Sequence, residues 1–174
     1  MSAQAKYDFY VNQDIPYRIW SVKYSVSEDA LRSYHDALVK HIGLVNRYGT
    51  EFGVEKSLLA VHDKSKWTKL EYPHYANSFH GNMVHSNRFV VAVNHHVLNN
   101  QHHPEYWSQT GEWYPMPRSY VLEMIADWHA ASFQYTGSDN IQDWLNKKFD
   151  KSRLHPRSID VLRKELKDIG YDLL

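Results

Sequence analysis

Apolar residues recur three and four positions apart over several long stretches of this chain, a spacing that predicts amphipathic α-helices. The clearest stretch begins near Ser25, because Ser25 and Glu28 have the spacing of a capping box. Gly49 supplies a C-terminal stop for the same helix. Its apolar stripe consists of Leu31, Tyr34, Leu38, His41 and Val45.

Further segments carry helical signals, and several are bounded by proline or glycine. Pro117 and Pro156 suit the first turn of a helix, and Gly137 and Gly170 suit the position after its end. Valines at helical spacing within residues 88–100 favour a helix there, although their β-branched side chains leave a strand possible. The expected helices cover residues 54–66, 71–79, 88–100, 118–133, 139–149 and 156–169.

The remaining segments lack a clear period. Residues 1–24 are expected to form an irregular, extended arm, and residues 81–87 and 102–116 to form loops. The pattern as a whole predicts an all-α fold, in which one bundle of about six helices over residues 25–174 follows the arm.

Length and charge narrow the class of protein. A chain of 174 residues suits one domain. Its 20 basic and 20 acidic residues balance, which makes nucleic acid an unexpected partner. The sequence has no cysteine, so disulfides, thiolate zinc sites and cysteine nucleophiles are excluded. Residues 1–10 do not resemble a signal peptide, and the apolar runs are too short to span a membrane, so a cytoplasmic protein is expected.

Twelve histidines are the feature that most needs a chemical explanation. The sharpest local motif is His62-Asp63-Lys64-Ser65-Lys66, which follows an apolar helical run. A neutral imidazole and a carboxylate together suit a divalent ion such as iron, manganese, cobalt or zinc. Lys66, about one turn further on, could hold a phosphate oxygen. The alternative is an ordinary helix end, with Lys64 or Lys66 near the helix dipole.

The order of these motifs resembles the HD-domain metal-dependent phosphohydrolases. An upstream helical histidine, His41 or else His35, precedes the His-Asp-x-x-Lys motif, and a distal Asp127 lies within an apolar stretch. Between them stand the histidine pairs 95–96 and 102–103. The chain is still more similar, over most of residues 38–160, to a small and largely uncharacterised phage and bacterial family of HD-like proteins. If the gene is phage-borne, the host cytoplasm is the expected location.

Only the wider superfamily implies chemistry. Its members hold one or two metal ions in a histidine and aspartate cage and hydrolyse phosphoesters, often of nucleotides. Carried over, the resemblance implies metal ligands at His41, His62, Asp63 and Asp127, with a further ligand at His102. The metal would be manganese, iron, cobalt, zinc or magnesium, as one or two ions.

Each candidate ligand has a simpler explanation. His41 shares the apolar stripe of its helix, as a hydrogen-bonded core histidine also would. Asp127 sits among apolar residues, and a buried carboxylate is costly unless it is paired or bound to a metal, so a salt bridge is the alternative. Glu123, four residues earlier on the same face, could hydrogen-bond a ligand histidine or act as a base.

The later histidines form two parallel sets, one with His96 and His103 and the other with His95 and His102. Because both sets cannot face inward at low cost, we expect His96 with His102 or His103 to enter the site. Pro104 ends the helix there and frees the pair to turn. Surface histidines are the alternative. Residues that could stack on a base or sugar, but that more often form core, are Trp20, Trp67, Tyr75, Tyr106 and Trp107.

The leading hypothesis from the sequence is a metal-dependent phosphohydrolase that acts on a small phosphorylated substrate, such as a nucleotide or deoxynucleotide. Lys66 would stabilise charge on the phosphoryl oxygens, and Glu71 or Glu123 would take or relay a proton. His96, His102 or His103 would hold a second metal or protonate the leaving oxygen. A di-iron oxygenase and a non-catalytic metal- or nucleotide-binding protein are the alternatives. A homo-oligomer is compatible with the sequence.

Overall fold

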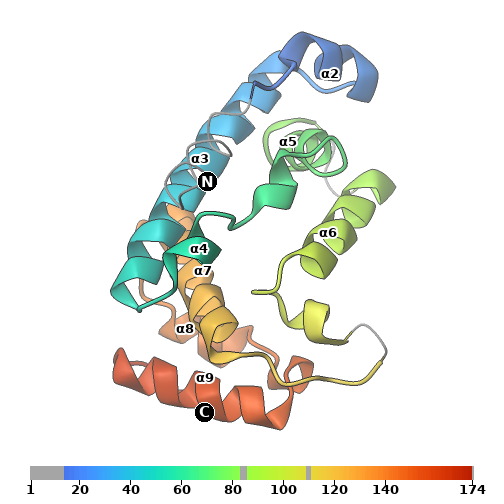
Figure 1. The fold of residues 1–174 in the computed structure, drawn as a ribbon. Helices are drawn as coiled ribbons and strands as arrows, with labels where there is room; N and C mark the ends of the chain where they lie inside the picture. The colour runs from blue at the N-terminus through green and yellow to red at the C-terminus, as the bar shows by residue number, and fades with distance from the viewer. Residues whose placement is uncertain (1–13, 83–85, 109–110, 174) are drawn as a thin grey trace.

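The computed structural model describes residues 14–82, 86–108 and 111–173, and its fold is all-α. These residues form α-helices and short 3-10 helices without any strand (Figure 1). The helices are α2 (Tyr17–Tyr24), α3 (Glu28–Glu51), α4 (Lys56–Leu59), η1 (Lys64–Trp67), α5 (Tyr72–His80), α6 (Asn87–Asn99), η2 (Pro104–Ser108), α7 (Arg118–Thr136), α8 (Gln142–Lys147), η3 (Lys151–Arg153) and α9 (Pro156–Asp168).

The 24-residue helix α3 packs against both α5 and α7 (Figure 1). Its N-cap is Ser27, whose hydroxyl accepts a hydrogen bond from the Ala30 amide at 3.1 Å. The expected capping box at Ser25 is therefore wrong, since Ser25 instead ends α2 in a left-handed conformation. Gly49 does not stop α3 either. A Cβ there would meet Leu59 Cδ2 at 2.5 Å, so the glycine allows close packing.

Two corrections concern the N-terminal half. Within the expected extended arm, Tyr17–Tyr24 form α2, which packs on α3 and α5; residues 1–13 lie outside the described part of the chain. The single helix expected over residues 54–66 is also wrong. It breaks into α4, a run of turns and η1. The backbone hydrogen bonds tighten there, for example from the His62 amide to the Leu59 carbonyl.

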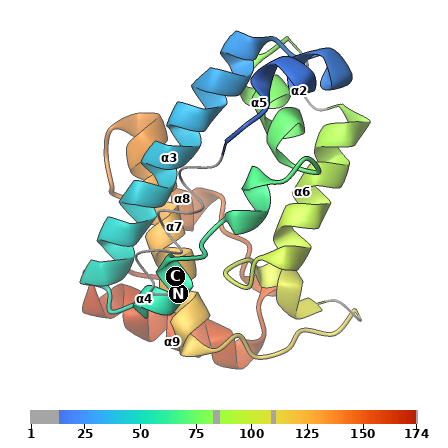
Figure 2. The same ribbon diagram turned by 45° about the horizontal axis from the view of Figure 1, so that its top comes forward.

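The central segment from α4 through η1 to α5 runs between α3 and α6, as Figures 1 and 2 both show. Helix α6 begins at the Ser86 N-cap, close to the expected start, and confirms the helical alternative for the valine-rich stretch. The expected loop after α6 contains the short helix η2. Figures 1 and 2 also show that α6 and the chain after it face the same central segment.

The C-terminal half closes the bundle with α7 and α9, which begin at Arg118 and Pro156 as expected. Gly137 and Gly170 follow their ends with positive φ. Helix α8 is shorter than the expected 139–149. The apolar faces of α7, α8 and α9 share one core cluster, which includes Ile125, Leu145 and Leu162.

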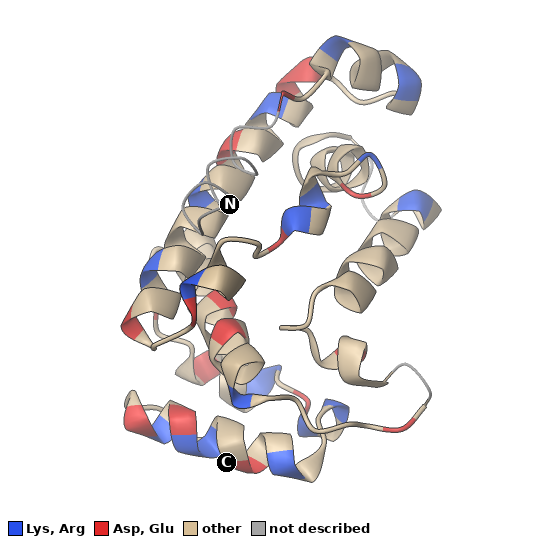
Figure 3. Ribbon diagram, viewed as in Figure 1, with Lys and Arg blue, Asp and Glu red and all other residues tan. Residues whose placement is uncertain are grey.

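The surface carries both signs of charge. Acidic and basic residues alternate along α9 and are mixed along α3 (Figure 3). Among the described residues, no helix is long and apolar enough to cross a membrane.

Candidate metal centre

Four side chains that are distant in sequence converge at the centre of the bundle. His41 comes from α3, His62 and Asp63 from the turns before η1, and Asp127 from α7. One donor atom from each lies within 4.8 Å of all the others. His41 Nε2 is 2.9 Å from Asp127 Oδ1 and 3.5 Å from Asp63 Oδ2. We call these four residues the first donor group.

The break in the expected helix explains how His62 and Asp63 can both face this point. Neighbouring residues of a regular α-helix point about 100° apart, because one turn takes 3.6 residues. Here the tight turns and a left-handed Asp63, with φ of 56°, bring the two side chains together. His62 Nε2 lies 3.6 Å from Asp63 Oδ2 and 3.7 Å from Asp127 Oδ1. A non-glycine residue with positive φ is strained, and such strain concentrates at functional sites.

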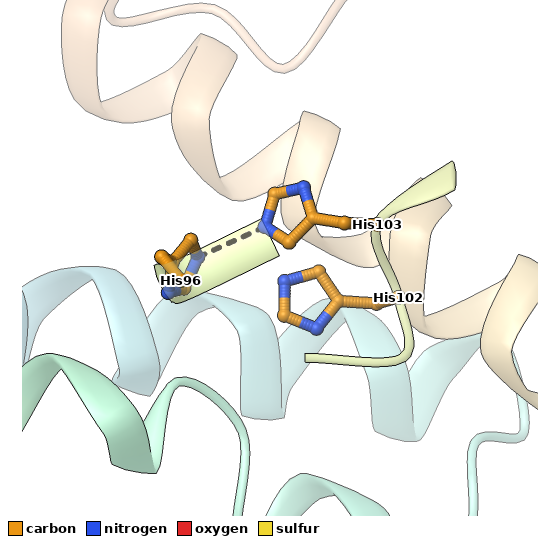
Figure 4. Close-up of side chains that lie close together, drawn as sticks. All are labelled: His96, His102 and His103. Atoms are coloured by element: carbon orange, nitrogen blue, oxygen red, sulfur yellow. Dashed lines mark hydrogen bonds between the residues drawn. The ribbon is translucent and has the colours of Figure 1, made fainter. Parts of the chain in front are cut away.

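A second donor group consists of His96, His102 and His103, whose donor atoms also lie within 4.8 Å of one another. His96 stands near the end of α6, and the other two follow it on the chain that leads into η2 (Figure 4). The Nε2 atoms of His96 and His103 are 2.9 Å apart (Figure 4). We expected His96 together with either His102 or His103, and in the structure both of the later histidines join His96.

Asp63, a member of the first donor group, also contacts the second group. Its Oδ2 faces the first group, while its Oδ1 lies 3.3 Å from His96 Nε2 and 3.6 Å from His102 Nε2. The side chain is fully buried. The two oxygens of one carboxylate are therefore available to both groups.

Several donor atoms are buried and have no partner in hydrogen-bond geometry. They are His41 Nε2, His62 Nε2, Asp63 Oδ1 and His102 Nε2. Buried polar atoms without a partner are rare and cost free energy of folding. Imidazole nitrogens and carboxylate oxygens that point at a shared centre are the donor set of a divalent transition metal. The residues present therefore fit a metal ion.

Two buried glutamates contact the Nδ1 atoms of these histidines and so orient their rings. Glu123 Oε1 lies 2.8 Å from His62 Nδ1 and 3.4 Å from His102 Nδ1. Glu71 likewise contacts His95 Nδ1 at 2.5 Å and His96 Nδ1 at 3.1 Å. A carboxylate on Nδ1 fixes the tautomer and leaves Nε2 as the donor atom, as is usual for metal-binding histidines.

Ser65 and Asn100 complete the support of His96, a role that the sequence did not suggest. The Asn100 amide donates to Ser65 Oγ at 2.7 Å, and Ser65 Oγ lies 3.2 Å from His96 Nδ1. Their only sequence signal was the four-residue spacing between His96 and Asn100 on one helix face.

The two groups differ in charge. Burial disfavours the charged form of His62, but Asp63, Asp127 and Glu123 outweigh it and raise its pKa to about 10. Burial also disfavours the charged form of Glu123. The His102 and His62 imidazoles that this carboxylate contacts outweigh burial and lower its pKa to about 2. In the second group, burial and the neighbouring His102 lower the pKa of His103 to about 3. His96 and His103 thus stay neutral, whereas His62 holds its proton until a cation displaces it.

Lys66 lies at the edge of the first group. Its Nζ donates to Asp63 Oδ2 at 2.6 Å. Burial opposes the charged form, yet Asp63 and Asp127 raise the pKa of Lys66, so the ammonium stays protonated. The position suits a positive charge that balances the carboxylates or contacts an anionic ligand.

Other candidates lie elsewhere. His35 Nδ1 and the Tyr17 hydroxyl are hydrogen-bonded at 2.9 Å, and His35 does not belong to either donor group. Among the residues considered for stacking, Trp67 and Tyr75 are buried in the core. His85 lies outside the described residues.

Comparisons with known proteins add one match. The sequence model of a family described as "Family of unknown function (DUF5662)" matches residues 31–168. No curated protein and no solved structure matches the chain.

Proposed function

We propose that this chain, which belongs to the DUF5662 family of unknown function, is a metal-dependent phosphohydrolase for small phosphorylated substrates. One observation carries the proposal. The donor atoms of His41, His62, Asp63 and Asp127 lie within 4.8 Å of one another, and the Nε2 atoms of the two histidines have no partner in hydrogen-bond geometry. This geometry fits the motif order by which the sequence resembles the HD-domain phosphohydrolases.

The first donor group would hold the ion. A divalent metal there supplies a water of lowered pKa and neutralises charge on a phosphate oxygen. His62 is kept in position by Glu123, and Asp63 is held by its contacts with both groups. These contacts leave the donor atoms little freedom to move, which favours binding of the ion in one geometry.

Lys66 would bind and orient the phosphate. Its ammonium lies beside Asp63 and on the wall of the pocket that reaches His41 and Asp127. A fixed positive charge at that point stabilises negative charge that develops on the phosphoryl oxygens. Glu71 could hold a proton, because burial raises its pKa even though the His95 hydrogen bond opposes the shift. Its contact with His96 gives a route for that proton to the second donor group.

The second donor group favours ligand chemistry over acid catalysis. Burial keeps the pKa values of His96 and His103 low, so both imidazoles are neutral at neutral pH. A neutral imidazole binds a metal readily through its free nitrogen but is a poor general acid, because only the imidazolium releases a proton near neutral pH. We therefore assign this group to a second ion, with Asp63 between the two.

A second candidate function follows from the same pair of groups. Five histidines and two aspartates, of which Asp63 contacts both donor groups, would also suit two iron ions, which would supply oxygen activation. An assay under nitrogen separates the two functions. Turnover that strictly requires oxygen would favour the oxygenase, and phosphate release without oxygen would favour the hydrolase.

The direct test combines metal analysis with turnover. Protein purified without chelator is expected to contain a divalent transition metal and to release phosphate from phosphate esters. Replacement of Asp63 by Ala should abolish metal binding and turnover together. The matched control is Asp160→Ala, because Asp160 is exposed on α9 and its one ion-pair partner within the described part of the chain is Arg163.

Full activity in the Asp63→Ala protein would exclude this metal centre. Protein that binds metal but leaves every phosphate ester intact would instead favour the non-catalytic binder.

A further inference from the structure

A pocket of about 360 Å³ opens directly onto the first donor group. His41, Lys66 and Asp127 form its polar end, and side chains from α3, α5 and α7 form the rest. The volume lies near the lower end of the roughly 300–1,000 Å³ found for small-molecule sites. A substrate that reaches the metal centre from this side must place its organic group in this pocket.

The charges on the pocket wall suit a single phosphate. Lys66 is the one lysine or arginine among the described residues that line it, and Asp63 already engages this ammonium. Partial burial lowers the pKa of His80, so that imidazole adds no positive charge at neutral pH. A diphosphate or triphosphate would extend further negative charges beyond the metal centre, where the described pocket lining offers no second lysine or arginine to balance them.

The rest of the wall suits a planar organic group. Phe79 and Tyr135 are 51% and 74% exposed, so their rings can be covered by a ligand. Aromatic side chains favour flat, apolar partners through stacked or edge-on contacts. Ala37 and Ala131 also line the pocket, and their small side chains leave this space open.

Tyr34 contributes a buried hydroxyl group to the pocket lining. It lines the pocket and is 6% exposed, and its hydroxyl has no hydrogen-bond partner. Burial, with Tyr75, Asp63 and Glu71, raises its pKa, so the hydroxyl keeps its proton. Tyr34 precedes His41 by seven residues on α3, which corresponds to two turns, or about 10 Å along the helix. An unpartnered, protonated hydroxyl in the pocket lining can donate a hydrogen bond to a ligand that binds there.

We propose that this pocket selects phosphate monoesters of a planar aromatic group, of the nucleoside monophosphate class, and that the Tyr34 hydroxyl donates a hydrogen bond to the organic group. The proposal rests on the hydrolase function for its kinetic test. Tyr34 acts as a specificity residue, while Ala37 and Ala131 set the space available.

The first experiment measures kcat and KM of the manganese-loaded protein for four substrates. Three are the mono-, di- and triphosphate of one nucleoside, and the fourth is glycerol phosphate. We expect kcat/KM to be at least tenfold higher for the monophosphate than for the triphosphate. Equal values for the two nucleotides, or a higher value for glycerol phosphate than for the monophosphate, would overturn the pocket assignment and leave the hydrolase function intact.

The second experiment fills the pocket. Ala131→Phe and, separately, Ala37→Phe should raise KM for the nucleoside monophosphate at least tenfold, with the metal content within twofold of the native protein. Ser33→Phe is the matched control, because Ser33 is exposed on α3 one turn before Ala37 and does not line the pocket. An unchanged KM in both alanine variants would overturn the proposal.

The third experiment isolates the hydroxyl. Tyr34→Phe should raise KM for the nucleoside monophosphate about threefold to tenfold with little change in kcat, since one neutral hydrogen bond is lost. The melting temperature should not fall, because the hydroxyl has no partner in the free protein. A lower melting temperature with unchanged KM would make the hydroxyl merely structural and refute its assigned role.

A binding measurement keeps the pocket testable if no phosphate ester is hydrolysed. In that case equilibrium dialysis of the nucleoside monophosphate against the manganese-loaded protein gives the dissociation constant directly. Binding that Ala131→Phe weakens at least tenfold supports the pocket although the hydrolase function fails. Absence of binding overturns the pocket as well.

Discussion

The carboxylate of Glu123 contacts two imidazoles of the metal centre at once, so its removal tests the whole arrangement. Glu123 Oε1 lies 2.8 Å from His62 Nδ1 and 3.4 Å from His102 Nδ1, and the residue is 4% exposed. By accepting from Nδ1, it holds each ring with Nε2 towards the donor groups. We expect Glu123→Ala to free both rings and weaken metal binding.

The size of the effect follows from the bonds lost. A hydrogen bond to a charged group contributes roughly 1.5–3 kcal/mol, and about 1.4 kcal/mol corresponds to a factor of ten. Loss of the shorter bond alone therefore predicts a roughly 10- to 100-fold weaker metal affinity. Glu123→Gln keeps an acceptor oxygen but removes its charge, and neutral bonds are about half as strong. The glutamine variant should therefore lose roughly fivefold.

The assay is calorimetric titration of manganese or zinc into chelator-stripped protein. The control is Glu51→Gln, which removes a carboxylate that is exposed on α3 and pairs only with Arg47 among the described residues. We expect the metal affinity to be highest, and equal, in the native and control proteins, lower in Glu123→Gln and lowest in Glu123→Ala. Native affinity in a folded Glu123→Ala protein would refute the idea that this carboxylate orients metal ligands.

Three further predictions use independent observables. Saturating metal, at one hundred times its dissociation constant, should stabilise the native protein by about 2.7 kcal/mol in a thermal melt; Asp63→Ala should gain nothing, and an equal gain would place the binding elsewhere. For the chelated protein, the pKa of Glu123 is lowered from 4.5 to about 2, because its histidine contacts outweigh burial. The contribution of this shifted pKa to the unfolding free energy is complete above pH 4.5 and is lost as the pH falls towards 2. The unfolding free energy from urea titrations should therefore fall less steeply between pH 4.5 and pH 2 in Glu123→Gln than in the native protein. Identical slopes would contradict this. Leu162→Ala removes a fully buried side chain of the α7–α9 core and should cost about 2–5 kcal/mol of unfolding free energy without changing metal stoichiometry; a cost below about 1 kcal/mol would contradict the packing.

The donor residues on regular helices were predictable because helical periodicity fixes which face a side chain shares. His41 stands on the stripe of Leu38 and Val45, and that stripe is buried in α3. Asp127 stands among apolar residues of α7, where a carboxylate requires a compensating partner. Local spacing alone identifies both as inward-facing polar residues.

The turn that carries His62 and Asp63 was not predictable in the same way. Its sequence reads as the end of an apolar helix, so a continuous helix over residues 54–66 was expected. The left-handed Asp63 contacts Lys66 three residues later, and it also contacts His96 and His41, which come from other parts of the chain. Periodicity carries no information about such long-range contacts.

The sequence by itself determined the helical class, most helix positions and the inward placement of His41 and Asp127, because these depend on interactions between residues three or four apart. Only the tertiary structure decided that Asp63 lies between two histidine groups, that His96, His102 and His103 all meet, and that Tyr34 lines a pocket beside them. Those features depend on how α3, α6 and α7 pack around the central turn, and packing geometry is set by the whole core.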